Sequence, residues 1–187
     1  MSDKKVVVYG ASGYTGRLVC EFLREYQVPF IAAGRNQQRI EEALAKVPGI
    51  ETADYEIVEV EHSVEALTQL LTGKTAVCNT VGPFDYFGDA VVQASVNAGC
   101  HYMDTTGEQA FMMEMRDKYA DQYQEKGLIL APSTAYMYTP LDIAMHMVLE
   151  DCGIDTIEGG CLAAGVHGCH NQIRTGDRIA SSINTRA

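Results

Sequence analysis

Short apolar runs alternate along the chain with longer segments in which apolar residues recur every three or four positions. The first run, Lys5 to Tyr9, is continuous and β-branched, which predicts a strand buried on both faces. From Thr15 to Tyr26 the apolar residues repeat at intervals of three and four, which predicts a helix with one buried face. The chain therefore opens with a strand that runs directly into an amphipathic helix.

The same alternation continues toward Leu149. Further strands are predicted at Phe30–Ala33, Tyr55–Val60, Thr75–Val81, His101–Asp104 and Leu128–Ala131, and further helices from the cap Asn36 through Lys46, from the cap Ser63, and at Asp89–Ala98, Glu108–Lys126 and Leu141–Leu149. Strands that alternate with helices favour a parallel sheet covered on both faces. With right-handed crossovers, the expected fold class is α/β, a doubly wound (Rossmann), mostly parallel sheet.

The pattern changes near residue 154. Glycines and histidines become frequent, no helical period continues, and a polar segment runs to Ala187. We expect a Rossmann dinucleotide-binding domain over residues 1–153. Residues 154–187 are expected to be the start, or a remnant, of a second α+β domain for substrate binding or dimerisation.

Three glycines separate the first strand from the first helix, the setting that a dinucleotide site requires. Gly10 permits a sharp exit from the strand, Gly13 leaves room for a pyrophosphate, and Gly16 lets the helix lie close to the sheet. Free N–H groups and the helix dipole favour phosphate at this point. The candidate cofactor-binding residues of the loop are Gly10, Ser12, Gly13, Tyr14, Thr15 and Gly16. The spacing is GxxGxxG rather than GxGxxG, so a plain tight turn is the alternative interpretation.

The end of the second predicted strand indicates which nucleotide binds. An NAD site usually has a carboxylate here for the ribose hydroxyl, but the sequence continues Gly34-Arg35-Asn36. The guanidinium of Arg35 suits a phosphate dianion, and Arg39 is one helical turn further on. NADP is therefore the expected cofactor and NAD the less favoured one. The alternative is an ordinary solvent-exposed arginine.

Three segments resemble a known family. GASGYTGRL from Gly10, AAGRN from Ala32 and NTVGPFDYFGDAVVQASVNAGCHYMDTTGE from Asn79 are similar to the N-terminal domain of saccharopine dehydrogenase-like oxidoreductases, and the trans-acting enoyl reductases look nearest. The resemblance covers about residues 5–165. It implies a domain that binds NADP(H) or NAD(H), followed by a second domain that completes the substrate cleft. It also implies that Thr80, Val81, Gly82 and Pro83 lie beside the cofactor.

The residues themselves favour the same location for the segment 79–84. It follows a buried strand and should reach the crevice where doubly wound sheets bind ligands, unless it is an ordinary strand–helix loop. Asp104 and Glu108 follow the next strand and are candidates for positioning or acid–base roles. In the alternative interpretation Thr106 is a helix cap and Glu108 favours the helix dipole. No catalytic residue is assigned.

Net charge and cysteine usage exclude some functions. The formal net charge is −11, so the surface repels nucleic-acid phosphates. No apolar run is long enough to span a membrane, and the first residues lack the apolar run and cleavage site of a signal peptide, so neither feature is expected. Its six scattered cysteines are expected to be reduced thiols of a cytoplasmic protein.

Other motifs carry little weight. Cys161, His167, Cys169 and His170 lack the close-set ligand pair of a zinc site, so no metal is expected. No Tyr-x-x-x-Lys pair supports short-chain dehydrogenase chemistry. The segment Thr72–Thr75 resembles the end of a P-loop, but Thr68 stands where the first glycine is needed.

The sequence thus favours an NADP(H)-dependent oxidoreductase that transfers hydride to or from a small carbonyl, imine or enoyl substrate. A non-catalytic NADP-binding sensor or scaffold module and a trans-acting reductase partner of a synthase are the alternatives. A homodimer is left open.

Overall fold

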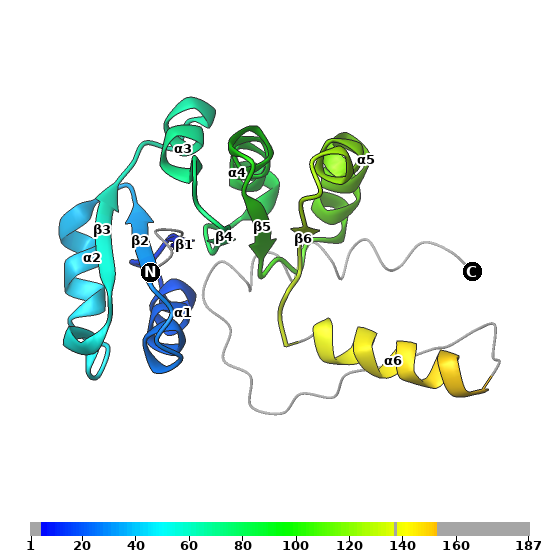
Figure 1. Ribbon diagram of the computed structural model, residues 1–187, viewed down its shortest axis with the longest axis horizontal. Coiled ribbons are helices and arrows are strands. Elements are labelled where there is room, and N and C mark those ends of the chain that lie inside the picture. The colour runs from blue at the N-terminus through cyan, green and yellow to red at the C-terminus, as the bar shows by residue number, and fades with distance from the viewer. Residues whose placement is uncertain (1–4, 137, 153–187) are drawn as a thin grey trace.

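The computed structural model of the protein describes residues 5–136 and 138–152 (Figure 1). Six parallel strands form one sheet in the order β3-β2-β1-β4-β5-β6. The strands are β1 (Val6–Tyr9), β2 (Phe30–Gly34), β3 (Tyr55–Glu59), β4 (Ala76–Asn79), β5 (His101–Asp104) and β6 (Leu130–Ala131). The predicted doubly wound, Rossmann-type sheet is confirmed.

A helix follows each strand within the described residues. The helices are α1 (Tyr14–Glu25), α2 (Gln37–Leu44), α3 (Val64–Leu71), α4 (Phe84–Ala98), α5 (Gln109–Glu125) and α6 (Thr139–Cys152), and a 3-10 turn η1 (Ile50–Thr52) precedes β3. Each predicted strand and helix is present, with shifted ends. The predicted start of a second domain, residues 154–187, lies outside the described residues.

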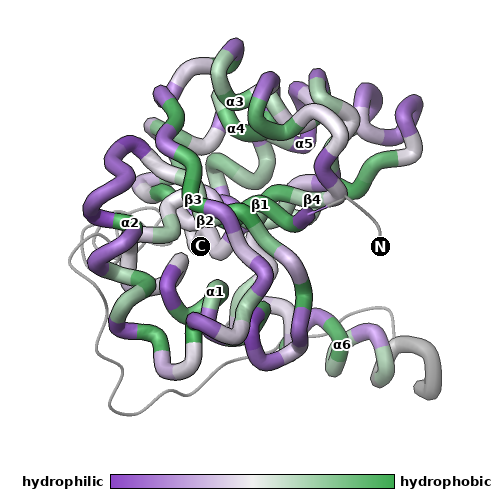
Figure 2. Tube along the Cα trace, turned by 60° about the vertical axis from the view of Figure 1, so that its left-hand side comes forward, coloured by the Kyte–Doolittle hydropathy of each residue, from purple (hydrophilic) through white to green (hydrophobic). Residues whose placement is uncertain are grey.

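Helices α3, α4 and α5 cover one face of the sheet, and α1 and α2 cover the other (Figure 1). The alternation of side chains along β1 builds both cores. Val7 and Tyr9 belong to the cluster under α3–α5, whereas Val8 packs with Phe30 and Ala32 under α1 and α2. Because both faces are buried, the central strands β1 and β4 are mostly apolar (Figure 2).

The parallel register brings the loops that follow the six strands to one edge of the sheet. Tyr9, the last residue of β1, pairs with Ala33 of β2 on one side and with Asn79 of β4 on the other. The chain reverses its direction of winding between β1 and β4, which is the position where doubly wound sheets bind ligands. The glycine loop, Arg35 and the segment 80–83 all lie at this carboxyl edge.

Helix α4 begins at Phe84, five residues before the predicted Asp89. The carboxylate of Glu108, which lies just before α5, holds the first turn of α4. Among the described helices, none combines the length and the hydropathy needed to cross a bilayer.

Candidate functional site

The loop after β1 presses against the loop after β4 at Gly10. Gly10 has φ +92°, and a Cβ there would lie 2.7 Å from Thr80 Oγ1 and 2.8 Å from Val81 Cγ2. The Thr80 hydroxyl donates to the Tyr9 carbonyl at 2.9 Å, which holds the two loops together. Only glycine fits at position 10. The sharp exit from the strand that was predicted for Gly10 is therefore present.

Gly16 brings α1 against the same loop. A Cβ at this buried position would overlap the Gly10 carbonyl oxygen and lie 2.8 Å from Ala11 Cα. The close helix packing predicted for Gly16 is therefore present. Gly13 donates its N–H to the same Gly10 oxygen at 2.9 Å, and its predicted role beside a pyrophosphate stays a prediction.

The N-terminus of α1 lacks the side-chain cap that neighbouring helices have. The Asn36 carboxamide accepts from Arg39 N–H at the start of α2, and Ser63 Oγ accepts from Ala66 N–H at the start of α3. At α1 the cap residue is Gly13, which has no side chain to contribute. The N–H groups of residues 14–16 have no described acceptor, and such groups bind phosphate well.

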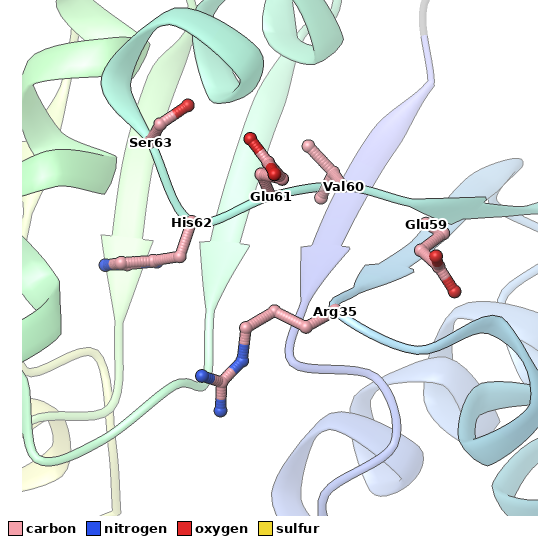
Figure 3. A pocket seen from close by; sticks show the side chains of 6 residues that line it. All are labelled: Arg35, Glu59, Val60, Glu61, His62 and Ser63. Carbon is pink, nitrogen blue, oxygen red and sulfur yellow. The ribbon is translucent and has the colours of Figure 1, made fainter.

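Arg35 faces a cavity of about 360 Å³ at the end of β2 (Figure 3). The lining residues are Arg35, Glu59, Val60, Glu61, His62 and Ser63. Arg35 is exposed, and within the described part of the chain its guanidinium has no carboxylate partner. In Figure 3 its side chain extends away from Glu59 and Glu61, toward the side on which the His62 ring lies. A guanidinium without a carboxylate partner is available to bind a phosphate group.

One of the two carboxylates that line this cavity is already engaged. Glu59 Oε2 accepts from the N–H of Gln37 at 2.7 Å, at the start of α2. Asn36 likewise uses its side-chain oxygen as the α2 cap. Arg39 is exposed in the first turn of α2 but is not among the residues that line the cavity. Of the two predicted arginines, Arg35 alone lines it.

His62 is a cavity residue that the sequence reasoning missed. Its Nδ1 lies 2.8 Å from the Tyr9 hydroxyl, and its ring stacks on the Tyr9 ring with centroids 5.9 Å apart. Burial, and after it the positive charge of Arg35, lower the pKa of His62. The doubly wound strand order could have predicted the position of His62, because it places the residues after β3 beside those after β2.

The predicted segment 80–83 lies beside the glycine loop, and Asn79 fixes its course. The Asn79 side chain is buried, and its oxygen accepts from Val81 N–H at 3.0 Å. Residues 80–83 are half-buried, so they form a partly open wall of the crevice.

Asp104 anchors backbone under the site. Its carboxylate is 1% exposed and accepts from the Tyr102 hydroxyl at 2.7 Å, from Thr106 N–H at 2.9 Å and from Ser133 N–H at 2.8 Å. Burial raises the pKa of Asp104, and the three donors partly oppose that rise. These contacts favour the structural interpretation over an acid–base role.

Glu108 holds the start of another helix. Its carboxylate accepts from the N–H groups of Phe84 at 3.1 Å and Asp85 at 2.6 Å, in the first turn of α4. Thr106 Oγ1 accepts from Glu108 N–H at 3.0 Å, but the cap expected of Thr106 is wrong, because the N-cap residue of α5 is Glu108. The carboxylate therefore serves the dipole of α4, whereas the sequence suggested its own helix α5.

The geometry thus brings together the glycine loop, the segment 80–83 and the Arg35 cavity. In the part of the chain that the structure describes, no three histidine, cysteine or acidic side chains cluster as metal ligands. Cys161, His167, Cys169 and His170 lie outside that part. The three cysteines whose side chains are described, Cys20, Cys78 and Cys100, are buried free thiols.

The family model of the saccharopine dehydrogenase NADP-binding domain matches residues 6–130 of the 187 residues of this chain. The chain belongs to the saccharopine dehydrogenase-like oxidoreductase family. The matched range covers the glycine loop, Arg35 and the segment 80–83, so the expected cofactor, NADP, is the one that this domain binds.

Relatives agree with the family. A lipid droplet localized protein of Caenorhabditis elegans is 31% identical over 159 residues, 81% of this chain and 37% of its own. The human saccharopine dehydrogenase-like oxidoreductase is 29% identical over 154 residues, 75% of this chain and 36% of its own. A Mycobacterium tuberculosis protein named as a trans-acting enoyl reductase is 28% identical, over 87% of this chain and 40% of its own. The chain therefore spans about two fifths or less of the length of these relatives.

Solved structures confirm the fold. A short-chain type dehydrogenase/reductase from Mycobacterium marinum superposes with a TM-score of 0.54 at 13% identity, over 76% of this chain and 78% of that one. An NADPH-dependent quinone oxidoreductase from Escherichia coli gives 0.50 at 19% identity, over 78% of this chain and 54% of that one. At such identities the likeness concerns the Rossmann architecture alone.

Proposed function

We propose that this protein is an NADP(H)-dependent oxidoreductase in which Arg35 binds the 2′-phosphate of the cofactor. The observation that carries the proposal is the exposed Arg35 guanidinium, which lines a cavity at the end of β2 without a carboxylate partner in the described chain. That position lies where doubly wound dehydrogenases distinguish the two dinucleotides. Family membership supports the oxidoreductase class.

The residues at the edge of the sheet fit a dinucleotide. The N–H groups of residues 14–16 would hold the pyrophosphate, aided by the hydroxyls of Ser12 and Thr15. Gly10 and Gly16 allow the close packing of the loop against the segment 80–83 and of α1 against the loop. The segment 80–83 would flank the nicotinamide half across the crevice, and Asn36, Arg39 and Tyr14 complete the proposed set.

When bound, NADPH supplies the hydride. The chain's own residues orient the cofactor and exclude water from one side of it. The proposed substrate is a small carbonyl, imine or enoyl compound. A trans-acting role beside a synthase is suggested only by the name of the M. tuberculosis relative.

A non-catalytic NADP-binding module is the second candidate. One observation favours it: the two carboxylates that the sequence offers for acid–base roles, Asp104 and Glu108, are both engaged by backbone N–H groups. Oxidation of NADPH by the full chain with panels of carbonyl, imine and enoyl compounds separates the two candidates, because a sensor binds NADPH without turnover.

We further propose a cytoplasmic location, although a C. elegans relative is named for lipid droplets and an Arabidopsis thaliana one for mitochondria.

Replacing Arg35 by alanine tests the cofactor assignment. Loss of a charge-assisted contact worth about 1.5–3 kcal/mol should weaken NADP binding at least about tenfold. NAD lacks the 2′-phosphate, so its affinity should change by less than about twofold. Isothermal titration of both nucleotides into the full chain measures the two affinities.

Arg116→Ala is the matched control, because it removes the same charge from the exposed Arg116–Asp117 pair on α5. An equal loss of NAD and NADP affinity in Arg35→Ala, or no loss of either, would contradict the assignment.

A further inference from the structure

His62 lies in the Arg35 cavity with its ring held from two sides. The Tyr9 hydroxyl lies 2.8 Å from Nδ1, the Tyr9 ring stacks against the imidazole, and Phe87 of α4 meets it edge-on with centroids 5.4 Å apart. These contacts fix the ring, and its Nε2 has no hydrogen-bond partner among the described residues. The imidazole is therefore an oriented polar group beside an unpaired guanidinium.

The Tyr9 hydroxyl can serve both protonation states of His62. When the ring is neutral, the hydroxyl donates to Nδ1, and the ring proton sits on Nε2. When the ring is charged, both nitrogens donate, and the phenol oxygen accepts from Nδ1. Protonation therefore keeps the ring in place.

Charged groups reach His62 from several elements. Arg35 comes from the end of β2 and Tyr9 from β1, while Glu59 and Glu61 flank it on its own segment and Glu65 lies in the first turn of α3. Phe87, its contact from α4, is uncharged. Burial and the Arg35 charge lower the pKa of His62, so the ring is neutral near pH 7 when no anion is bound.

A phosphate dianion at Arg35 reverses that balance. It neutralises the guanidinium and adds negative charge beside the ring, and both changes favour imidazolium. We propose that His62 is a specificity-determining residue of this site, which takes up a proton when the 2′-phosphate binds and then pairs with it. This inference rests on the proposed function, because NAD brings no such phosphate.

The sign of the pH dependence follows from linkage. The ring binds a proton more weakly in the free protein than in the NADP complex, so NADP affinity rises as the pH falls through the bound pKa of His62. The 2′-phosphate itself protonates near pH 6 and acts in the opposite direction. A variant without the imidazole retains only this second effect.

Calorimetric titration of the full chain with NADP and NAD, at several values between about pH 8 and about pH 6, tests the inference. For a rise of about one pKa unit on binding, the ratio of NADP to NAD affinity grows about three- to fivefold over this range, because the full tenfold gain requires a pH below the free pKa of His62. In His62→Gln the ratio stays flat or falls. His146→Gln, which removes an exposed imidazole on α6, should behave like the unmodified protein. Repeating the titrations in two buffers of different ionisation enthalpy counts the protons taken up, expected with NADP and not with NAD.

The inference is overturned if NADP is preferred through Arg35 at every pH but His62→Gln leaves the pH dependence unchanged. It is also overturned if His62→Gln weakens NAD and NADP equally without proton uptake, because His62 would then contact the part that both nucleotides share. Failure of the proposed function gives a different result: NADP binds no tighter than NAD at any pH, and Arg35→Ala has no effect. That result overturns both proposals.

Discussion

Single residues decide whether a dinucleotide can approach the sheet. The sequence predicted the roles of Gly10 and Gly16, because a sharp strand exit and a close helix both require glycine, and both contacts are present. It did not predict Tyr9 and His62 as partners. Their contact joins residues 53 positions apart, and a lone tyrosine on an apolar strand gives no local sign of a polar partner.

Gly16→Ala should damage the cofactor loop directly. The added methyl group would overlap the Gly10 carbonyl oxygen, and this backbone can move only by shifting the whole loop. We expect a loss of about 1–3 kcal/mol of unfolding free energy together with weaker NADP binding. Chemical denaturation and titration with NADP measure the two effects.

Gly107→Ala is the control for that change. A Cβ at Gly107 meets no described atom within 4 Å, and its φ is not positive. Normal stability and NADP affinity in Gly16→Ala would show that the loop does not need its present backbone path.

At the scale of helices, side chains distant in sequence determine where each element begins. The strands and the caps Asn36 and Ser63 were predictable, because their signals are local. The start of α4 was not, since the carboxylate that holds it comes from Glu108, 24 residues further along. A second contact between α4 and α5 requires Gly88, because a Cβ there would overlap the buried ring of Phe111.

Glu108→Gln tests the helix-capping role. Glutamine keeps one acceptor oxygen, turns an NH₂ group toward the second backbone N–H, and loses the charge that favours the helix dipole. The free energy of unfolding should fall by about 1–2 kcal/mol, as measured by urea denaturation.

The exposed Glu114 on α5 provides the matched control, and Glu114→Gln should change stability by less than about 0.5 kcal/mol. If Glu108→Gln is as stable as the unmodified protein, the carboxylate does not hold α4.

For the whole molecule, sheet order and site location follow from one rule. Strand–helix alternation with right-handed crossovers predicts the order that the structure has, and the reversal between β1 and β4 places the ligand edge. Val60, Glu61, His62 and Ser63 follow β3 and line the cavity, but no local motif marks them as ligand-binding residues, so they were not predicted. The same topology would have placed Glu61 and His62 beside Arg35.

The central claim is that this edge of the sheet selects NADP through Arg35. Titration of the full, unmodified chain with NADP and NAD under identical conditions tests it most directly. We expect NADP to bind at least about tenfold more tightly, and Arg35→Ala to remove most of that difference. Binding of NAD as tightly as NADP, or more tightly, by the unmodified protein would rule out the selection of NADP by Arg35.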